Sequence, residues 1–414
     1  MNNLFKRLKD KENKILLTNF GYLSILQVAG FLFPLITLPY IARVLGIDIF
    51  GKIAFASAII IWFQTISDWG FNFTATRDIS INRNDKDKLS EIFSNVFWSK
   101  CILMIFSLLL LIIFVYFIPK LNDNWKIILI TFLIIPGQIM FPDWFFQGIE
   151  KMKYISILNL LSKIIFTIAV FVFIKEESDY LLQPLFISLG YIFTGVISMY
   201  IILYKWRVKL QSPDYFKISR TIKLSTNVFV NNFVPNLYNS FSTILLGYYW
   251  GSFANGILEA ANKFVALNHQ LMNVVARTFF PFLSRKLDKH DIYVKLNLFL
   301  SLSISIFLFF LSPFLIKLFF TSDFYEAINV LRILSFSIFL IAIRNVYGTH
   351  YLILKGYDKE LRNFTFLGSF IGFLLAFPLI YFFSYIGLSI NIIIAQSIMA
   401  FFVIKKAKKI KNKL

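Results

Sequence analysis

The chain has 414 residues, of which 58% are hydrophobic, 19% aromatic and 15% charged. Soluble domains usually carry about 25% charged residues, so this composition excludes an ordinary soluble protein and predicts one that lies mostly within a bilayer. The formal net charge of +20 is also typical of nucleic-acid binding, but the basic residues stand in loops and tails beside apolar runs. Anionic lipid and membrane topology explain basic residues at such places, and we therefore expect no nucleic-acid partner.

The N-terminus is basic and leads into an apolar run, as a signal peptide does. This run is too long for a signal peptide and has no small-residue cleavage site, so we predict a retained first membrane span. Apolar runs of about 20 residues cross a bilayer as helices, and polar breaks divide the chain into such runs. Twelve spans are predicted, at residues 16–44, 52–73, 92–118, 125–147, 154–174, 181–204, 222–249, 255–280, 295–314, 328–354, 361–383 and 386–404.

The connecting segments differ in charge between the two sides of the membrane. One set carries 31 of the 42 lysines and arginines, and the opposite set carries 6. Basic segments stay in the cytoplasm, so both termini are predicted to be cytoplasmic. The basic set comprises the N-terminus, residues 74–91, 148–153, 205–223, 277–295 and 355–362, and the tail from Lys405. The opposite connections are short and leave no room for an outer catalytic domain.

The longest basic connection, residues 205–223, separates six spans from six. It predicts an N-terminal six-helix bundle over 1–210 and a C-terminal one over 211–414. The link "GIDIFG" between the first two spans recurs as "GSFANG" after a shift of 205 residues, which also places Ala56 on Ala261. Six spans per half keep the same orientation, so we predict a parallel repeat with substrate between the bundles. The expected fold class is an all-α polytopic membrane protein with a central cavity.

The outer links of the two halves are predicted to act as hinges. Their glycines are Gly46 and Gly51 in the first half and Gly251 and Gly256 in the second. Pro34 and Pro39 are expected to interrupt and bend the first span, because proline removes a helical hydrogen bond. Bent helices are typical of transporters, although packed membrane helices also contain proline.

Polar side chains inside predicted spans are costly and point to a wet or paired environment. Three spans carry them at spacings that match one helical face. In span 8 they predict a face toward a cavity, with an ion pair between the first two members as the alternative. In span 7, cavity lining and helix packing stay equal alternatives. The residues are Glu259, Lys263, Gln270, Asn273 and Arg277 in span 8; Asn232, Asn236, Asn239 and Thr243 in span 7; and Ser57, Gln64, Asp68 and Asn72 in span 2.

Asp68 is a candidate proton or cation site, with a helix cap or an ion pair as the alternative, and Arg77 as the partner to test. Lys100 and Lys163 stand near a cytoplasmic end, where we expect them to snorkel. Packing or hydrogen bonding is expected for His269 and His350. Arg344 lies on one side of span 10 with Tyr347 and Tyr351.

The chain has no Walker motif, zinc-ligand spacing or dinucleotide fingerprint. We therefore expect a protein that is not an enzyme, does not hydrolyse ATP itself and binds no cofactor. Coupling to H+ or Na+ stays open.

Several stretches along the chain carry a resemblance to a known family. They are "FPLITLPYIARVLGIDIFGKIAFASAIIIWFQTISDWGFNFTATRDIS", "PDWFFQGIEKMKYI", "ILLGYYWGSFANGILEAANK", "RTFFPFLSR", "LRILSF" and "NVYGTHYLILKG". Together they resemble the polysaccharide-transport, or O-antigen flippase, family of the multidrug/oligosaccharidyl-lipid/polysaccharide exporter superfamily. The resemblance implies two six-helix bundles around a cavity that opens alternately to the two sides of the bacterial cytoplasmic membrane.

The family's usual cargo is a short glycan on undecaprenyl diphosphate, moved from the inner to the outer leaflet. The resemblance thus implies membrane lipids as surroundings and, as partners, the polymerase and chain-length regulator of the same pathway. A diphosphate needs cations in a protected aqueous cleft. Our candidates for substrate binding are Arg43, Arg77, Lys263, Arg277 and Arg344, with Gln270, Asn273, Asn232 and Asn236, and those for coupling or gating are Asp68 and Glu259.

Three alternatives remain. A drug/cation antiporter of the same superfamily shares the fold, but the excess of cations on the inner faces disfavours it. A polytopic glycan polymerase or lipid-linked glycosyltransferase generally needs a long outer loop or a cytoplasmic catalytic domain. A lipid II flippase commonly has two further spans, so the prediction of twelve counts against it.

Overall fold

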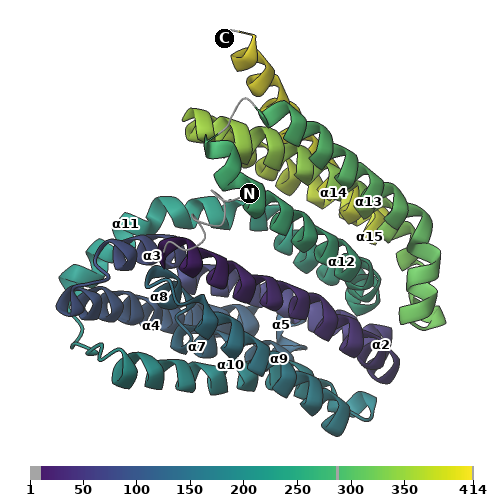
Figure 1. Ribbon diagram of the computed structural model, residues 1–414. Helices are drawn as coiled ribbons and strands as arrows, with labels where there is room; N and C mark the ends of the chain where they lie inside the picture. The colour runs from purple at the N-terminus through teal and green to yellow at the C-terminus, as the bar shows by residue number, and fades with distance from the viewer. Residues whose placement is uncertain (1–10, 286–288, 413–414) are drawn as a thin grey trace. The chain divides into compact units, whose positions relative to one another are not determined.

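The computed structural model describes residues 11–285 and 289–412, and every regular element among these residues is a helix (Figure 1). The chain divides into two compact units. The first holds the residues up to Tyr40 together with Ile60–Asn232, and the second holds Ile41–Ile59 together with the residues from Phe233 onward. The long first helix therefore contributes to both units.

The first unit contains most of the shorter helices. It includes parts of α2 (Lys11–Asp68) and nearly all of α11 (Tyr215–Phe233). Its other elements are α3 (Phe71–Ile81), α4 (Lys86–Phe117), α5 (Pro119–Asn122), α6 (Trp125–Phe132), α7 (Ile134–Met140), α8 (Asp143–Gly148), α9 (Met152–Phe173), η1 (Glu177–Leu181), α10 (Leu182–Tyr200) and η2 (Ile201–Lys205).

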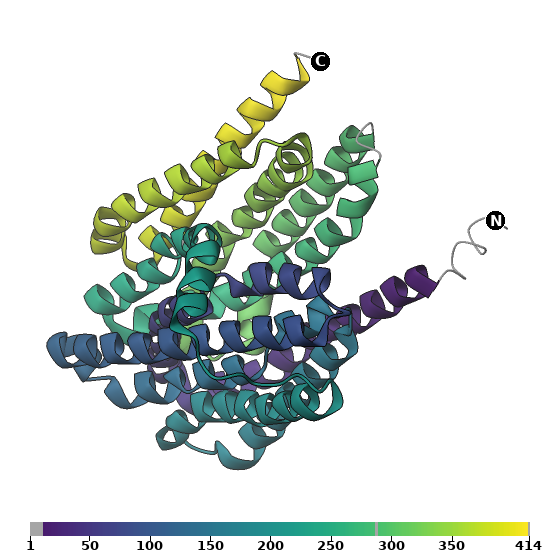
Figure 2. The ribbon, with the colours of Figure 1, turned by 90° about the vertical axis from the view of Figure 1, so that its left-hand side faces the viewer.

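The second unit is built mainly on long helices, of which α13, α14 and α15 lie side by side in Figure 1 and Figure 2. Its elements are η3 (Val234–Leu237), α12 (Ser240–Arg285), α13 (His290–Phe319), η5 (Ser322–Phe324), α14 (Ala327–Ile343), η6 (Arg344–Leu352), η7 (Ile353–Lys355) and α15 (Asp358–Lys411).

Eight helical segments in the described part of the chain are long and apolar enough to cross a membrane. They confirm a multi-pass membrane protein. Helices α11 and α12 do not meet this criterion, because polar residues interrupt their apolar runs. The count of twelve stays a prediction. The eight segments are Leu32–Ile81, Lys86–Phe117, Trp125–Gly148, Met152–Phe173, Glu177–Lys205, His290–Phe319, Ala327–Lys355 and Asp358–Lys411.

Three long helices, α2, α12 and α15, each consist of two helices joined at a kink. The kinks lie at Gly46 (φ 70°), Gly251 (φ 79°) and Ser384 (φ 52°), within three predicted links. Glycine adopts positive φ without the steric cost that a Cβ imposes. The prediction that Pro34 and Pro39 interrupt the first span is wrong, since α2 continues through both and is non-helical only at Gly46.

In the second unit, the 41–59 segment of α2 crosses α12 at two glycines. A Cβ on Gly51 would lie 1.8 Å from the carbonyl oxygen of Ser252, and a Cβ on Gly256 would lie 2.4 Å from that of Ile47. Each glycine therefore faces the residue four positions before the other glycine. Asp48 adds a polar contact, because its Oδ1 accepts a hydrogen bond from Ser252 Oγ at 3.0 Å. The two backbones approach closely because neither glycine has a side chain.

In the first unit, an aromatic core holds α3, α4 and α8 together. Phe71, Phe93, Trp144 and Phe145 are almost completely buried there. The ring of Phe93 packs on those of Trp144 and Phe145, with centroids 5.8 Å and 5.7 Å away. Such aromatic pairs contribute about 0.5–1.5 kcal/mol each beyond area burial. This core fixes the start of α8 against α4.

The glycine crossing predicts that Gly51→Ala and Gly256→Ala destabilise the protein. Overpacking at a tight contact costs about 1–3 kcal/mol, so each variant should unfold at a lower temperature in detergent. Gly21→Ala is the control, because no described atom lies within 4 Å of its Cβ position. Equal unfolding temperatures for all three variants would contradict the crossing.

Candidate functional site

The first unit contains a helix break between α2 and α3. Trp69 (φ 44°) and Gly70 (φ 78°) both have left-handed backbone. The ring of Trp69 stacks on that of Phe229 at 3.9 Å between centroids, and its indole N–H donates to the Ile222 carbonyl oxygen at 3.2 Å. A Cβ on Gly70 would lie 2.7 Å from Val228. Because left-handed backbone costs a non-glycine residue roughly 1–3 kcal/mol, these contacts to α11 hold the break in place.

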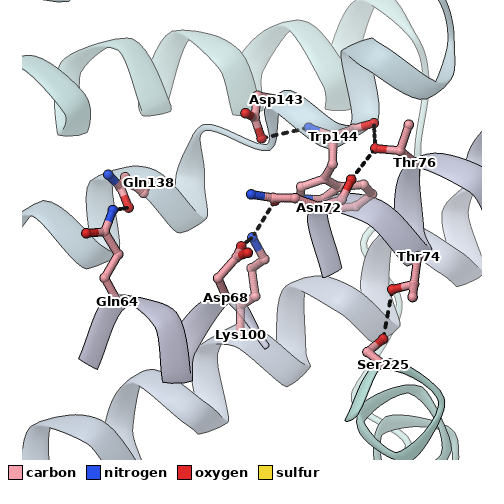
Figure 3. Close-up of polar contacts among 10 residues, drawn as sticks. All are labelled: Gln64, Asp68, Asn72, Thr74, Thr76, Lys100, Gln138, Asp143, Trp144 and Ser225. Carbon is pink, nitrogen blue, oxygen red and sulfur yellow. Dashed lines mark hydrogen bonds and ion pairs between the residues drawn. The ribbon is translucent and has the colours of Figure 1, made fainter. Parts of the chain in front are cut away.

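Lys100 of α4 joins the two sides of this break (Figure 3). Its Nζ lies 2.7 Å from Asp68 Oδ1, at the end of α2, and 3.3 Å from Asn72 Oδ1, in α3. The Lys100 side chain is 8% exposed and that of Asp68 is 27% exposed. A charged amine this deeply buried needs a charged partner, and Asp68 provides it.

These contacts correct two sequence predictions. The partner of Asp68 is Lys100, whereas Arg77 pairs with its neighbour Asp78 at 3.0 Å on an exposed surface. The prediction that Lys100 snorkels is also wrong, because the residue is 6% exposed. Arg77 is not the partner because the break at Trp69–Gly70 ends the helix that contains Asp68. The two residues therefore stand in different helices and do not share one helical face.

Asp143 is a second carboxylate in the same place, and sequence reasoning missed it. It is the first residue of α8, and its Oδ1 accepts a hydrogen bond from the Trp144 N–H at 2.8 Å. Thr76 of α3 donates a hydrogen bond to the Trp144 carbonyl oxygen at 3.2 Å, and this bond joins α3 to α8 (Figure 3). In the sequence, the only sign of this residue's importance is that an aspartate directly follows Pro142 within an apolar run.

The arrangement holds one ammonium and two carboxylates beside neutral amides. Nearby, Gln64 Nε2 donates to Gln138 Oε1 at 2.6 Å. No group of three or more histidine, cysteine, aspartate or glutamate side chains in the described residues is suited to a metal ion.

In the second unit, α12 presents the polar stripe predicted for span 8. Lys263 and Glu259 are in contact, as their spacing predicts, and their side chains are 39% and 26% exposed. Gln270 and Asn273 are exposed. These residues share a face that the described residues of the unit leave largely uncovered. The side chain of Arg277 lies outside the described part of the structure.

The prediction of one polar face along span 7 is wrong. Helix α11 ends at Phe233 and α12 begins at Ser240, with a 3-10 turn containing Pro235 between them. Asn232 is exposed at the end of α11, whereas Asn236 lies in the turn. Proline lacks the N–H that a continuous helix needs, so a single helical spacing does not apply across this segment.

The remaining predicted cations differ in their exposure. Arg43 is exposed in α2. Arg344 is half-buried, and its Nη1 donates to Met399 Sδ at 3.4 Å. Beside it, Tyr351 is buried and Tyr347 half-buried.

The two histidines are held by hydrogen bonds, as predicted. His350 contacts the Ala276 carbonyl oxygen at 2.8 Å, and His269 contacts Ser337 at 3.3 Å.

The bridge at the helix break predicts a large coupling energy between Lys100 and Asp68. Lys100→Met leaves Asp68 without its cation, which should cost roughly 1–3 kcal/mol of stability. A double-mutant cycle with Asp68→Asn, measured by unfolding in detergent, should return a coupling larger than that between Arg77 and Asp78. Exposed pairs contribute about 0–1 kcal/mol. A coupling no larger than that of the exposed pair would argue against a structural bridge.

Comparisons with known proteins agree with this fold. The family described as polysaccharide biosynthesis protein matches residues 16–287. A protein described as a putative O-antigen transporter of Escherichia coli (strain K12) is 30% identical over 389 residues, which cover 92% of this chain and 94% of that protein. One with the same description from Shigella dysenteriae is 26% identical over 399 residues, covering 94% and 99%.

Two solved structures show the same fold at low identity. The lipid II flippase MurJ in an inward closed conformation has a TM-score of 0.77 and 15% identity, with 95% of this chain and 87% of that chain covered. The eukaryotic MATE transporter AtDTX14 has a TM-score of 0.69 and 12% identity, with 97% and 99% covered. The expected MATE-like fold and a transporter rather than an enzyme are thereby confirmed. The chain belongs to the polysaccharide biosynthesis protein family.

Proposed function

We propose that this protein flips an undecaprenyl-diphosphate-linked oligosaccharide, the repeat unit of O-antigen or a related surface polysaccharide, from the cytoplasmic to the periplasmic leaflet by alternating access. The observation that carries the proposal is similarity to putative O-antigen transporters over 92% or more of the chain. Lipid-linked oligosaccharide is a substrate that suits a membrane protein of this family. The likeness to MATE transporters concerns the fold alone and supports no drug-export activity.

Cations on uncovered faces support an anionic head group as cargo. Arg43 is exposed, and Lys263 is partly exposed beside Gln270 and Asn273. Charge-assisted hydrogen bonds to phosphate contribute more than neutral ones, and amides bind sugar hydroxyls. In the proposal, Glu259 pairs with Lys263 before the substrate binds. The diphosphate then takes the place of Glu259 at Lys263, so Glu259 acts as the gating carboxylate. Arg77, Arg277 and Arg344 remain candidates for further contacts, with Asn232 and Asn236.

We propose twelve membrane helices in two bundles, 1–210 and 211–414, related as a parallel repeat. Two observations support the repeat. Gly46 (φ 70°, ψ 174°) and Gly251 (φ 79°, ψ −170°) share one non-helical conformation, 205 residues apart. Gly51 and Gly256 make the reciprocal close contacts described above. The glycine links then serve as paired hinges, one for each bundle.

The proposed location is the bacterial cytoplasmic membrane with both termini in the cytoplasm, and the polymerase and chain-length regulator of the pathway are proposed partners. The asymmetry of 31 against 6 basic residues supports this orientation.

Removal of either uncovered cation is expected to reduce export. Arg43→Ala or Lys263→Ala should lower surface polysaccharide about tenfold in a complementation assay, since a charge-assisted hydrogen bond contributes about 1.5 kcal/mol or more. Protein level, measured by immunoblot, should stay unchanged. Lys355→Ala is the control, because Lys355 is also exposed but stands in a predicted cytoplasmic connection. Full export by both variants would remove the cationic-cleft hypothesis.

Cysteine labelling tests the orientation. In a Cys101→Ser background, Ser252→Cys and the more exposed Asp48→Cys should react with a membrane-impermeant maleimide added outside, after permeabilisation of the outer membrane. Ser212→Cys, which is exposed in the basic 205–223 connection, should react only when the inner membrane is opened. The reverse pattern would refute the topology and the repeat together.

A further inference from the structure

One buried histidine in the second unit has both of its ring nitrogens against backbone carbonyl oxygens. His350 of η6 is 1% exposed. Its Nδ1 lies 2.9 Å from the Asn345 carbonyl oxygen in η6, and its Nε2 lies 2.8 Å from the Ala276 carbonyl oxygen in α12. A carbonyl oxygen only accepts hydrogen bonds, and a neutral imidazole carries hydrogen on one nitrogen alone. Both contacts are therefore hydrogen bonds only when His350 is an imidazolium cation.

We propose that His350 is a proton-binding site and that its charged form fastens α12 to η6. In a neutral ring, the lone pair of one nitrogen faces a carbonyl oxygen at hydrogen-bond distance, and that contact is repulsive. The bound proton thus joins two helices that are far apart in the sequence. The chemical step is the uptake of one proton by one ring nitrogen, and the proton is released as the pH rises.

The surroundings of His350 compensate a buried positive charge. The residue stands near the end of the apolar segment Ala327–Lys355. Ionisable residues in such segments pair with one another or with backbone carbonyls. Hydrogen bonds from a charged donor are roughly twice as strong as neutral ones, and the imidazolium donates two. The ring of Tyr293 in α13 lies 5.0 Å away between centroids, within the range at which an aromatic ring attracts a cation.

The other two histidines of the chain have contacts that a neutral ring can make. His290 of α13 contacts the Val346 carbonyl oxygen through Nε2 at 3.0 Å, and its Nδ1 is buried without a hydrogen-bond partner in the described structure. His269 of α12 contacts Ser337 Oγ through Nε2 at 3.3 Å. Because the Ser337 hydroxyl donates to the Leu334 carbonyl oxygen, His269 is the donor in that contact. Each ring needs hydrogen on Nε2 only.

The other titratable and charged groups of this region come from α12, α13, η6 and α15. The carboxylate of Asp291 is paired with Lys411, so these two charges compensate each other. Arg277 follows Ala276 in α12, and its side chain lies outside the described part of the structure. The remaining groups are His290 and Tyr293 of α13 and Arg344, Tyr347 and Tyr351 of η6.

Release of the proton loosens a helix that carries part of the proposed substrate face. Helix α12 holds Glu259 and Lys263 on its uncovered side. The partner element, η6, is a π-helix, and π-helical turns occur frequently at functional sites. In the proposed transport cycle, His350 therefore makes the hold on α12 weaker as the pH rises. This consequence rests on the proposed function, whereas the proton site does not.

Nitrogen NMR reads the protonation state of each ring directly. The purified full-length protein, labelled with 15N-histidine and reconstituted in lipid, gives imidazole signals that differ between the imidazolium and each neutral tautomer. Near neutral pH we expect two protonated nitrogens for His350 and one for each of His269 and His290. As the pH rises, His350 should lose one proton. His269→Gln and His290→Gln assign the signals, so His350 itself stays unchanged in this measurement.

Unfolding in detergent tests whether the proton fastens α12. His350→Gln removes the charge, so the variant should unfold at a lower temperature than the unmodified protein. This difference should shrink as the pH rises, because the unmodified protein then loses its second hydrogen bond. His290→Gln is the matched control, since His290 also bonds to a carbonyl oxygen of η6 but through one nitrogen. Its effect on the unfolding temperature should stay the same over that pH range.

Two results would overturn the proton site. One is an unprotonated nitrogen on His350 near neutral pH, which the NMR measurement reveals even if His350→Gln does not fold. The other is a difference in unfolding temperature between His350→Gln and the unmodified protein that does not depend on pH. A doubly protonated His350 in a protein that does not support surface polysaccharide export would leave the proton site standing and refute the proposed transport function alone.

Discussion

The structure depends on one constraint of the bilayer, namely that hydrocarbon provides no water for backbone N–H and C=O groups. Nearly every described residue is therefore helical, and each departure from the helix needs compensation from the protein itself. The departures at Gly46, Gly251 and Trp69–Gly70 are compensated in different ways. Glycine or tryptophan residues accordingly stand at these helix breaks.

In the second unit the compensation is geometric. The kinks at Gly46 and Gly251 lie close to Gly51 and Gly256, whose missing side chains let two helices touch through their backbones. In the first unit the compensation is aromatic and electrostatic, since Trp69 stacks on Phe229 while Lys100 bridges the break. The two units thus hold their helix breaks in place by different interactions.

Several features were predictable because they depend on local composition or spacing. Apolar runs predicted a multi-pass helical protein, and repeated glycines 205 residues apart predicted links that coincide with kinks at Gly46 and Gly251. The i,i+4 spacing predicted the contact between Glu259 and Lys263. The prediction of one helical face along span 7, which includes Asn232 and Asn236, was wrong because a proline-containing turn interrupts the helix.

The sequence by itself determined the class of protein, since hydropathy and the excess of basic residues are sums over many positions and survive errors in single ones. It also singled out Asp68, because an isolated carboxylate among apolar residues is unfavourable, and left a proton or cation site, a helix cap and an ion pair as alternatives. Only the tertiary structure decided that the partner is Lys100 and that Asn72 contacts the same ammonium. These residues come from three separate helices, and their meeting depends on the break at Trp69–Gly70, which no local spacing encodes.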